Sequence, residues 1–260
     1  MNGIMTQHMD ARIGSFRLED ITMTVEKGTV MGLLGRNGAG KTTLFRTING
    51  TMLKTGGVLE VCGKTFETDE MGIRSVLSVV YDTMNVNPYS KGKRLLKYAR
   101  HFHPSFDEAF FEEMVERFSI DLNKRVSALS LGAQKKLMLA LALAKRPKVL
   151  LLDEPMIGID PIDRRAMTDL IQAYMEDEDN TVVISSHQVE DLEKICDGVT
   201  VIDQGRVVVS QDKETLMERY VRVKGQHTVM DAESALKQGL ETETATLEDI
   251  FVHLVGKERD

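Results

Sequence analysis

The sequence predicts an α/β fold in which helices flank a mostly parallel β-sheet. Three continuous apolar runs, at residues 77–81, 149–152 and 181–185, have the character of strands that are buried on both faces of such a sheet. Helical patterns at 161–175 and 188–195 alternate with the later runs, and this alternation indicates parallel pairing. A chain of 260 residues can bury such a core and still carry smaller subdomains.

Two regions break this alternation and predict additional subdomains. Residues 13–25 alternate loosely between apolar and polar side chains, which predicts antiparallel strands, and residues 58–62 resemble another such strand. From about 83 to 145 the pattern is helical, which predicts an inserted helical subdomain. We therefore expect a main domain over residues 1–225 and a more polar C-terminal extension over 226–260.

The loop at residues 35–43 carries the first chemical signal. It matches the phosphate-loop pattern G-x-x-x-x-G-K-[ST] and lies between an apolar run and a helical pattern. Its glycines allow successive backbone N–H groups to point inward at a helix N-terminus, which makes a nest for a polyphosphate. We expect Lys41 to reach the β- and γ-phosphates and Thr42 to bind Mg²⁺. The residues expected to contact the nucleotide here are Gly35, Asn37, Gly38, Ala39, Gly40, Lys41, Thr42 and Thr43.

A pair of acidic residues supplies the second signal. Asp153 and Glu154 follow the apolar run at 149–152, and ligands bind at this end of the strands in open parallel sheets. We expect Asp153 to hold Mg²⁺, and Glu154 to orient and deprotonate the water that attacks the γ-phosphate. A pair that only caps a helix is the structural alternative, but the neighbouring phosphate loop favours the catalytic interpretation. Together the two motifs predict a P-loop NTPase core.

The phosphate loop and the acidic pair, in this order, resemble those of the nucleotide-binding subunit of an ATP-binding-cassette (ABC) transporter. The resemblance extends over about residues 10–210. The family's signature segment follows its helical insert, and residues 129–133 stand in that position here, with Ser130 and Gly132 retained. The resemblance implies that this signature binds the ATP held by a second subunit in a head-to-tail dimer, although Ser130 alone would be taken for a helix N-cap. It also implies that His187 contacts the γ-phosphate.

Three departures from the family pattern affect the expected site. Asp82 stands where glutamine is usual, and we expect it to approach Mg²⁺ or its bound water. Leu131 and Ala133 replace the usual glycine and glutamine of the signature. The aromatic residue that normally stacks on adenine falls at Ile13, which leaves Phe16 as the nearby candidate for contacting the base.

Charge and hydropathy narrow the function classes. A net charge of -7 argues against a broad nucleic-acid surface, so no nucleic-acid partner is expected. The longest apolar run, at 137–144, is too short to cross a bilayer. We therefore expect an ATPase that uses ATP and Mg²⁺ to power transport, with export favoured, through a separate integral membrane permease. The resemblance implies a cytoplasmic location, peripheral at the inner face of the membrane, and a second ABC subunit that is identical or different.

Two other function classes are alternatives. A soluble cassette ATPase that acts on nucleic acid or ribosomes commonly carries tandem cassettes or a long coiled coil, and residues 41–130 contain no sustained heptad run. A nucleotide-binding regulator that no longer hydrolyses ATP is disfavoured because Glu154 and His187 are both retained.

Overall fold

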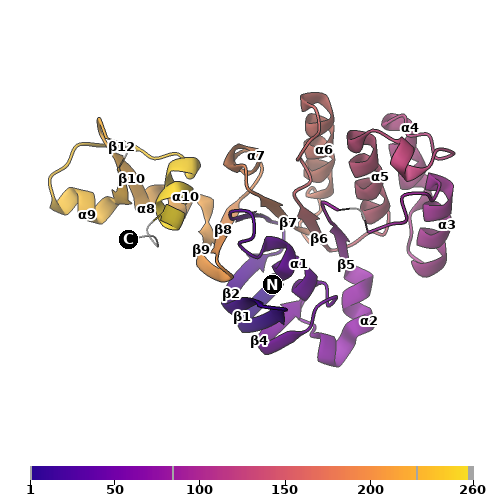
Figure 1. Cartoon of the computed structure of the whole chain (residues 1–260), viewed down its shortest axis with the longest axis horizontal. Coiled ribbons are helices and arrows are strands. Elements are labelled where there is room, and N and C mark those ends of the chain that lie inside the picture. The colour runs from indigo at the N-terminus through magenta and orange to yellow at the C-terminus, as the bar shows by residue number, and fades with distance from the viewer. Residues whose placement is uncertain (1, 84, 227, 257–260) are drawn as a thin grey trace.

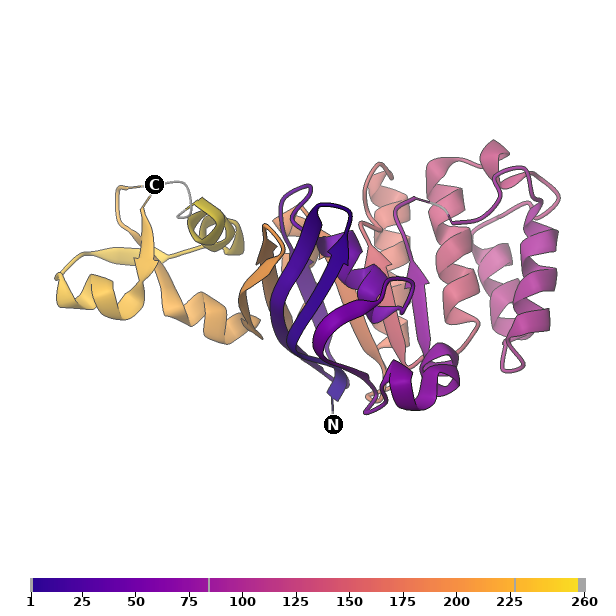
Figure 2. The ribbon, with the colours of Figure 1, turned by 60° about the horizontal axis from the view of Figure 1, so that its bottom comes forward.

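The computed structural model describes residues 2–83, 85–226 and 228–256, which form a central α/β core with further segments on either side (Figure 1). The inserted helices lie at one end of the long axis, and the C-terminal segments lie at the other. The antiparallel strands near the N-terminus lie against the core between these two ends (Figure 2). The predicted α/β architecture is confirmed.

The core is a six-stranded sheet with the strand order β5-β6-β7-β3-β8-β9. Every neighbouring pair is parallel except β8 and β9, which pair antiparallel. The strands are β3 (Val30–Leu34), β5 (Leu77–Val80), β6 (Val149–Asp153), β7 (Thr181–Ser186), β8 (Gly198–Asp203) and β9 (Arg206–Asp212). Strand β7 therefore lies between the strand that leads into the phosphate loop and the strand that leads into the acidic pair.

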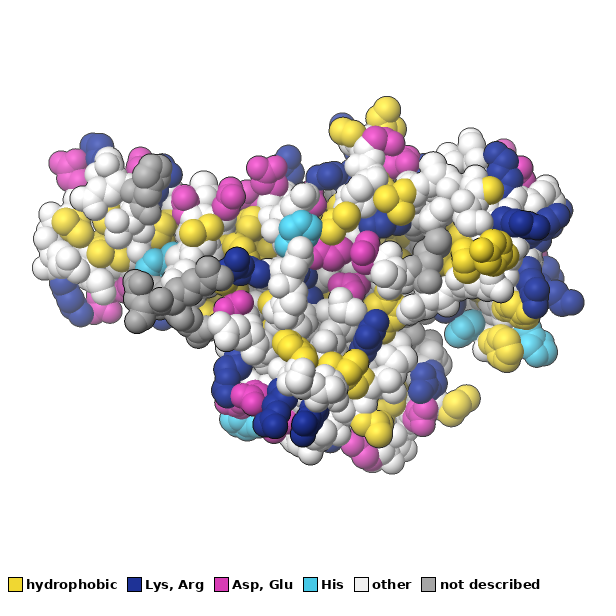
Figure 3. Space-filling model, in the orientation of Figure 1, with side chains coloured by type: hydrophobic (Ala, Val, Ile, Leu, Met, Phe, Trp, Pro, Cys, Tyr) yellow, Lys and Arg dark blue, Asp and Glu magenta, His cyan; other side chains and the backbone are white. Residues whose placement is uncertain are grey.

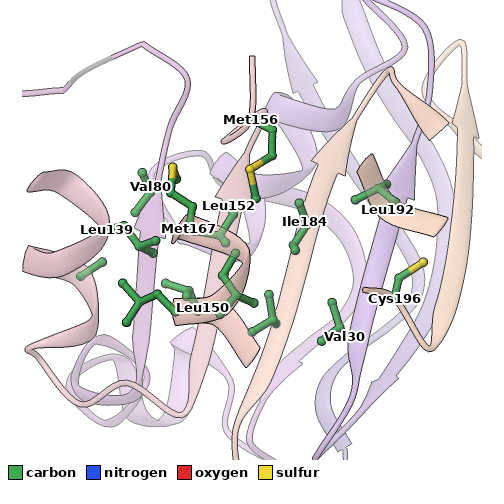
Figure 4. Packing of buried hydrophobic residues seen from close by; sticks show 14 of the residues in the cluster. Val30, Val80, Leu139, Leu150, Leu152, Met156, Met167, Ile184, Leu192 and Cys196 are labelled. Carbon is green, nitrogen blue, oxygen red and sulfur yellow. The ribbon is translucent and has the colours of Figure 1, made fainter. Parts of the chain in front are cut away.

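Side chains of the sheet alternate between two hydrophobic layers. Leu150 and Leu152 of β6 belong to one layer, whereas Val149 and Leu151 belong to the other. Because successive side chains of a strand point to opposite faces, a strand covered on both sides must be apolar throughout. Figure 4 shows part of the first layer, between the sheet and its covering helices. These helices are α5 (Leu131–Leu143), α6 (Pro161–Tyr174) and α7 (Val189–Glu193).

The second layer is covered by two helices and an antiparallel sheet. The helices are α1 (Lys41–Ile48) and α2 (Phe66–Val76), and the sheet has the order β2-β1-β4, with β1 (Asn2–Ile13), β2 (Phe16–Glu26) and β4 (Lys54–Val61). The predicted antiparallel strands are confirmed, but the prediction begins at residue 13 and omits most of β1. Irregularities in its register interrupt the simple alternation of side chains, which hides this strand from a periodicity analysis.

The inserted subdomain consists of α3 (Gly92–Phe102), α4 (Glu108–Arg117) and α5. Its aromatic side chains divide into two groups. Phe111 is fully buried and joins the first hydrophobic layer, whereas Phe102 is 69% exposed. Core packing therefore explains Phe111 but not Phe102, and apolar side chains gather on the surface of this subdomain, at the right of Figure 3.

The C-terminal segments form a small α/β unit around a three-stranded sheet of order β11-β10-β12. Its elements are α8 (Lys213–Arg219), β10 (Tyr220–Val223), β11 (Val229–Asp231), α9 (Ala232–Lys237), β12 (Thr242–Thr244) and α10 (Leu247–Gly256). The sequence analysis expects the C-terminal extension to begin at residue 226, but β10 precedes this boundary and pairs with β11 and β12, which follow it. We therefore propose that the unit begins near Lys213, at the start of α8. Within the described ranges, none of the helices combines the length and the apolar character that crossing a bilayer requires.

Candidate active site

The candidate site lies at the carboxyl edge of the central sheet, where three neighbouring parallel strands end. Strand β3 leads into the phosphate loop, β7 ends directly before His187, and β6 ends at Asp153. Side chains that follow adjacent parallel strands converge at this edge. The strand order therefore brings the two sequence motifs together, with the end of β7 between them. Acidic side chains gather beside a histidine near the middle of the face shown in Figure 3.

The phosphate loop has a backbone that only glycine adopts readily. Gly38 and Gly40 have φ angles of 83° and 116°. A Cβ atom on Gly35 would lie 2.5 Å from the carbonyl oxygen of Ile202 in the neighbouring strand. Helix α1 begins at Lys41, and Gly40 has no side chain to cap it. The first N–H groups of α1 are therefore available to an anion.

Lys41 is a buried cation, with only 6% of the residue exposed. Its Nζ donates to the carbonyl oxygen of Gly35 at 2.6 Å and lies 3.1 Å from Oε1 of Glu154. The side chain thus reaches from the phosphate loop to the acidic pair. Phosphate oxygens entering the loop would be alternative partners for the same ammonium group.

Asp153 is held from two sides. Oγ1 of Thr42 donates to its Oδ2 at 2.7 Å, and Oγ of Ser185 donates to its Oδ1 at 2.6 Å. A hydroxyl and a carboxylate in contact are the hard oxygen ligands that Mg²⁺ prefers. The structure therefore brings together two of the three residues that the sequence assigns to the metal, and Ser185 fixes the orientation of the carboxylate. The third, Asp82, lines the same cavity, and its Oδ1 lies 3.3 Å from Nζ of Lys135.

Glu154 has an unusual backbone conformation for a residue with a side chain. Its φ of 48° lies in the left-handed region, which costs a non-glycine residue about 1–3 kcal/mol. Its N–H donates to Oγ of Ser185 at 3.0 Å and lies 3.2 Å from the carbonyl oxygen of the same residue. Its carboxylate lies 3.1 Å from Nζ of Lys41 and 3.1 Å from Nδ1 of His187. The turn therefore directs the carboxylate between a cation and an imidazole.

The phosphate loop, the acidic pair and His187 line a cavity of about 490 Å³. Phe16 and Ile13 face each other across the β1–β2 hairpin and both line it. Gly35 and Ala39 are buried and do not line it. The predicted site residues that do line the cavity are Phe16, Asn37, Gly38, Gly40, Lys41, Thr42, Thr43, Asp82, Asp153, Glu154 and His187.

The signature residues Ser130 and Gly132 lie outside this cavity. Oγ of Ser130 accepts a hydrogen bond from the N–H of Ala133 at 3.2 Å and so caps helix α5. Gly132 packs tightly against α6, because an added Cβ would lie 2.0 Å from Oδ2 of Asp163. The first residue of the helix, Leu131, is 46% exposed. One chain thus presents the signature at its surface, apart from its own phosphate loop.

A cavity that joins a phosphate loop, an acidic pair and a histidine at the edge of a parallel sheet defines a P-loop ATPase. Comparison with known proteins identifies the family. The chain matches the family model for the ABC transporter over residues 18–157. It is 31% identical over 210 residues to the ABC transporter ATP-binding protein YtrB of Bacillus subtilis (strain 168), and the aligned region covers 81% of this chain and 72% of YtrB. It is also 31% identical over 207 residues to NatA, another ABC transporter ATP-binding protein of that organism, over 77% of this chain and 84% of NatA.

Solved structures agree with this assignment. An ATP-binding subunit of an ABC transporter has the same fold, with a TM-score of 0.79 at 21% identity over 96% of this chain and 98% of that chain. The cbiO1 protein of Clostridium perfringens, described as part of the ABC transporter complex cbiONQ, superimposes with a TM-score of 0.69 at 26% identity over 84% of this chain and 91% of that chain. The chain belongs to the ABC transporter family and is an ATP-binding, ATP-hydrolysing subunit, as its motifs predict.

Ser185 is a site residue that the sequence analysis misses. It is fully buried and contacts both members of the acidic pair. The available signal was a serine at the end of an otherwise apolar strand, directly before the segment that carries His187. Hydrogen bonds to charged groups contribute about 1.5–3 kcal/mol, so this hydroxyl has a substantial effect on where Asp153 points.

We predict that Ser185→Ala lowers the rate of ATP hydrolysis by about tenfold or more, because Asp153 loses a charge-assisted hydrogen bond and Glu154 loses one of its backbone acceptors. Steady-state hydrolysis measures the rate, and calorimetry with ATP measures the affinity, which should change little. Ser186→Ala is the matched control, because Ser186 is also buried on β7 and, among the described residues, its Oγ accepts from the N–H of Gln188 and contacts neither acidic residue. Equal loss of activity in the two variants would contradict a role for Ser185 in the site.

Proposed function

We propose that the chain hydrolyses ATP with Mg²⁺ to power export through a separate membrane-spanning partner. The observation that carries the proposal is the convergence of Lys41, Asp153, Glu154 and His187 in one cavity beside a phosphate nest. Export is supported by a relative named Nod factor export ATP-binding protein I from Burkholderia lata, which is 32% identical over 76% of this chain and 66% of that protein. A membrane partner is supported by the similarity to cbiO1 of Clostridium perfringens, which is part of the ABC transporter complex cbiONQ.

The residues act in a defined order as ATP is hydrolysed. The phosphate loop and Lys41 bind the β- and γ-phosphates first. The ion pair between Lys41 and Glu154 then breaks, because Lys41 binds phosphate oxygens instead of the carboxylate. Glu154 is then free to accept a proton from the attacking water, and His187 stands at the same carboxylate to contact the γ-phosphate. Thr42 and Asp153 fit Mg²⁺, which when bound neutralises charge on the phosphates.

The complete site requires a second chain. Ser130 is exposed at the N-terminus of α5 and does not line the cavity that holds Lys41. A helix N-terminus with a serine hydroxyl suits a γ-phosphate, and head-to-tail pairing of two subunits would bring it to the partner's ATP. We therefore propose that the subunit works as a dimer with two shared sites, paired with itself or with another ABC subunit.

A groove of about 300 Å³ is the proposed contact with the membrane partner. Its walls are β5 with the segment after it, helix α3 and helix α5, so an occupant touches both the strand that leads to Asp82 and the helix that begins after Ser130. Burial lowers the pKa of Lys145 and of His103 in this groove, with the Lys145 charge adding to the effect on His103. Most of the side chains that line the groove are apolar, so it suits a mainly apolar segment.

The occupant that we propose is a short cytoplasmic segment of an integral membrane permease. This arrangement places the subunit at the inner face of the cell membrane through its partner. The exposed ring of Phe102 on the rim of the groove gives such a segment an apolar anchor.

We predict that Phe102→Asp reduces copurification of an integral membrane protein with the tagged subunit by about tenfold, because it places a charge where an apolar segment docks. Quantitative mass spectrometry of detergent-solubilised membranes measures the partner. Met71→Asp is the control, since Met71 is 79% exposed on α2, away from the groove. The proposal fails if the two variants retain the same amount of membrane protein as the wild type.

A second prediction concerns the shared site. Lys41→Ala and Ser130→Arg should each be inactive alone, the first for loss of the phosphate-binding cation and the second because its bulk and charge disrupt the signature in each site that contains it. If the chain pairs with itself, mixing the two variants gives dimers with one intact composite site, and about a quarter of the wild-type turnover should return. Wild-type turnover by Ser130→Arg alone would show that Ser130 is only a helix cap.

A further inference from the structure

Lys135 is a buried lysine on helix α5, with 6% of the residue exposed. Its Nζ donates to the carbonyl oxygens of Glu154 and Ile157, at 2.9 Å each, and lies 3.3 Å from Oδ1 of Asp82. An ammonium group has three donors and no acceptor. All three are therefore used, and every partner belongs to a segment that borders the nucleotide cavity.

The contact with Glu154 bears on its backbone. Ser185 holds the N–H of this residue, and Lys135 holds its carbonyl oxygen. The peptide units before and after the Glu154 Cα atom are thus each held by a hydrogen bond, the first from β7 and the second from α5. A conformation of this kind persists only where the surroundings over-determine it. The direction of the Glu154 carboxylate depends on both contacts.

The contact with Asp82 completes the arrangement. The side chain of Asp82 is 45% exposed and lines the nucleotide cavity, while that of Lys135 is 8% exposed. Burying an ammonium group without a counter-charge is unfavourable, so the carboxylate at position 82 balances Lys135. Asp82 is therefore paired with a helix of the inserted subdomain as well as facing the cavity.

We propose that Lys135 is a positioning residue that fixes the turn carrying Glu154 and ties helix α5 to the nucleotide site of its own chain. Ser130 caps the N-terminus of the same helix. A displacement of α5, caused by a ligand at its N-terminus or in the groove along its side, acts through Lys135 on the carbonyls of Glu154 and Ile157 and on Asp82. The catalytic carboxylate thereby responds to the position of the inserted subdomain.

The experiment compares Lys135→Met with Lys136→Met. Lys135→Met keeps the apolar stem but removes all three donors, and we expect kcat for ATP hydrolysis to fall about tenfold or more while the Kd for ATP stays within about threefold, since the phosphate loop is untouched. Lys136 is the matched control, because its side chain is similarly buried, at 12% exposed, and its Nζ lies 2.5 Å from Oδ1 of Asp163 on α6, which does not line the cavity. Lys136→Met should keep kcat within about threefold of the wild type.

The proposal is overturned if Lys135→Met keeps the wild-type kcat, or if both lysine variants lose kcat equally and in proportion to folded protein measured by circular dichroism. Should Lys135→Met not fold, Lys135→Gln retains two of the three N–H donors without the positive charge, and it is judged by the same comparison of kcat with Kd. The proposal rests on ATP hydrolysis by this subunit and not on the export partner. Its failure would leave the copurification result unaffected, so the two can be distinguished.

Discussion

The buried ion pair between Lys41 and Glu154 is the interaction on which the rest of the site depends. Their side chains are 7% and 11% exposed, and the charged atoms are 3.1 Å apart at the edge of an apolar sheet. Removing one member of such a pair leaves an uncompensated buried charge, so each side chain needs the other or an equivalent partner. The β- and γ-phosphates of ATP are such a partner for Lys41. In the mechanism that we propose, exchange of that partner releases the Glu154 carboxylate to deprotonate the attacking water.

Strand β7 connects the phosphate loop with the acidic pair. It lies between the strands that carry the two sequence motifs, and it leads to His187. Near its end, Oγ of Ser185 donates to the carboxylate of Asp153 and accepts from the backbone N–H of Glu154. Buried polar networks are stabilising when every group has a partner, and here each contact also sets the direction of a reacting group. On the other side of the acidic pair, Lys135 connects the same turn to the inserted helices. The site is thus fixed by the sheet and linked to a subdomain that carries the proposed partner contacts.

The phosphate loop and the acidic pair could be predicted because the residues of each motif lie close together in the sequence, at a spacing that is typical of nucleotide-binding sites. The roles of Ser185 and Lys135 could not, since each depends on a neighbour that only the strand order and the packing of α5 determine. In the sequence of the mainly apolar helix α5, Lys135 has no feature that separates it from its neighbour Lys136, which pairs with Asp163 of α6. The small sheet of the C-terminal unit could not be predicted, because strands of three or four residues, such as β10 and β11, are too short to show a period.

The central claim is that Glu154, held between Lys41 and His187, is the base for ATP hydrolysis. The most direct test is the turnover of Glu154→Gln at saturating MgATP, together with its affinity for ATP. Glutamine keeps the size of the side chain but cannot accept the proton, so the account predicts that turnover falls by about a hundredfold or more while ATP still binds. Turnover at the wild-type rate, in a variant that folds and binds ATP normally, would contradict it.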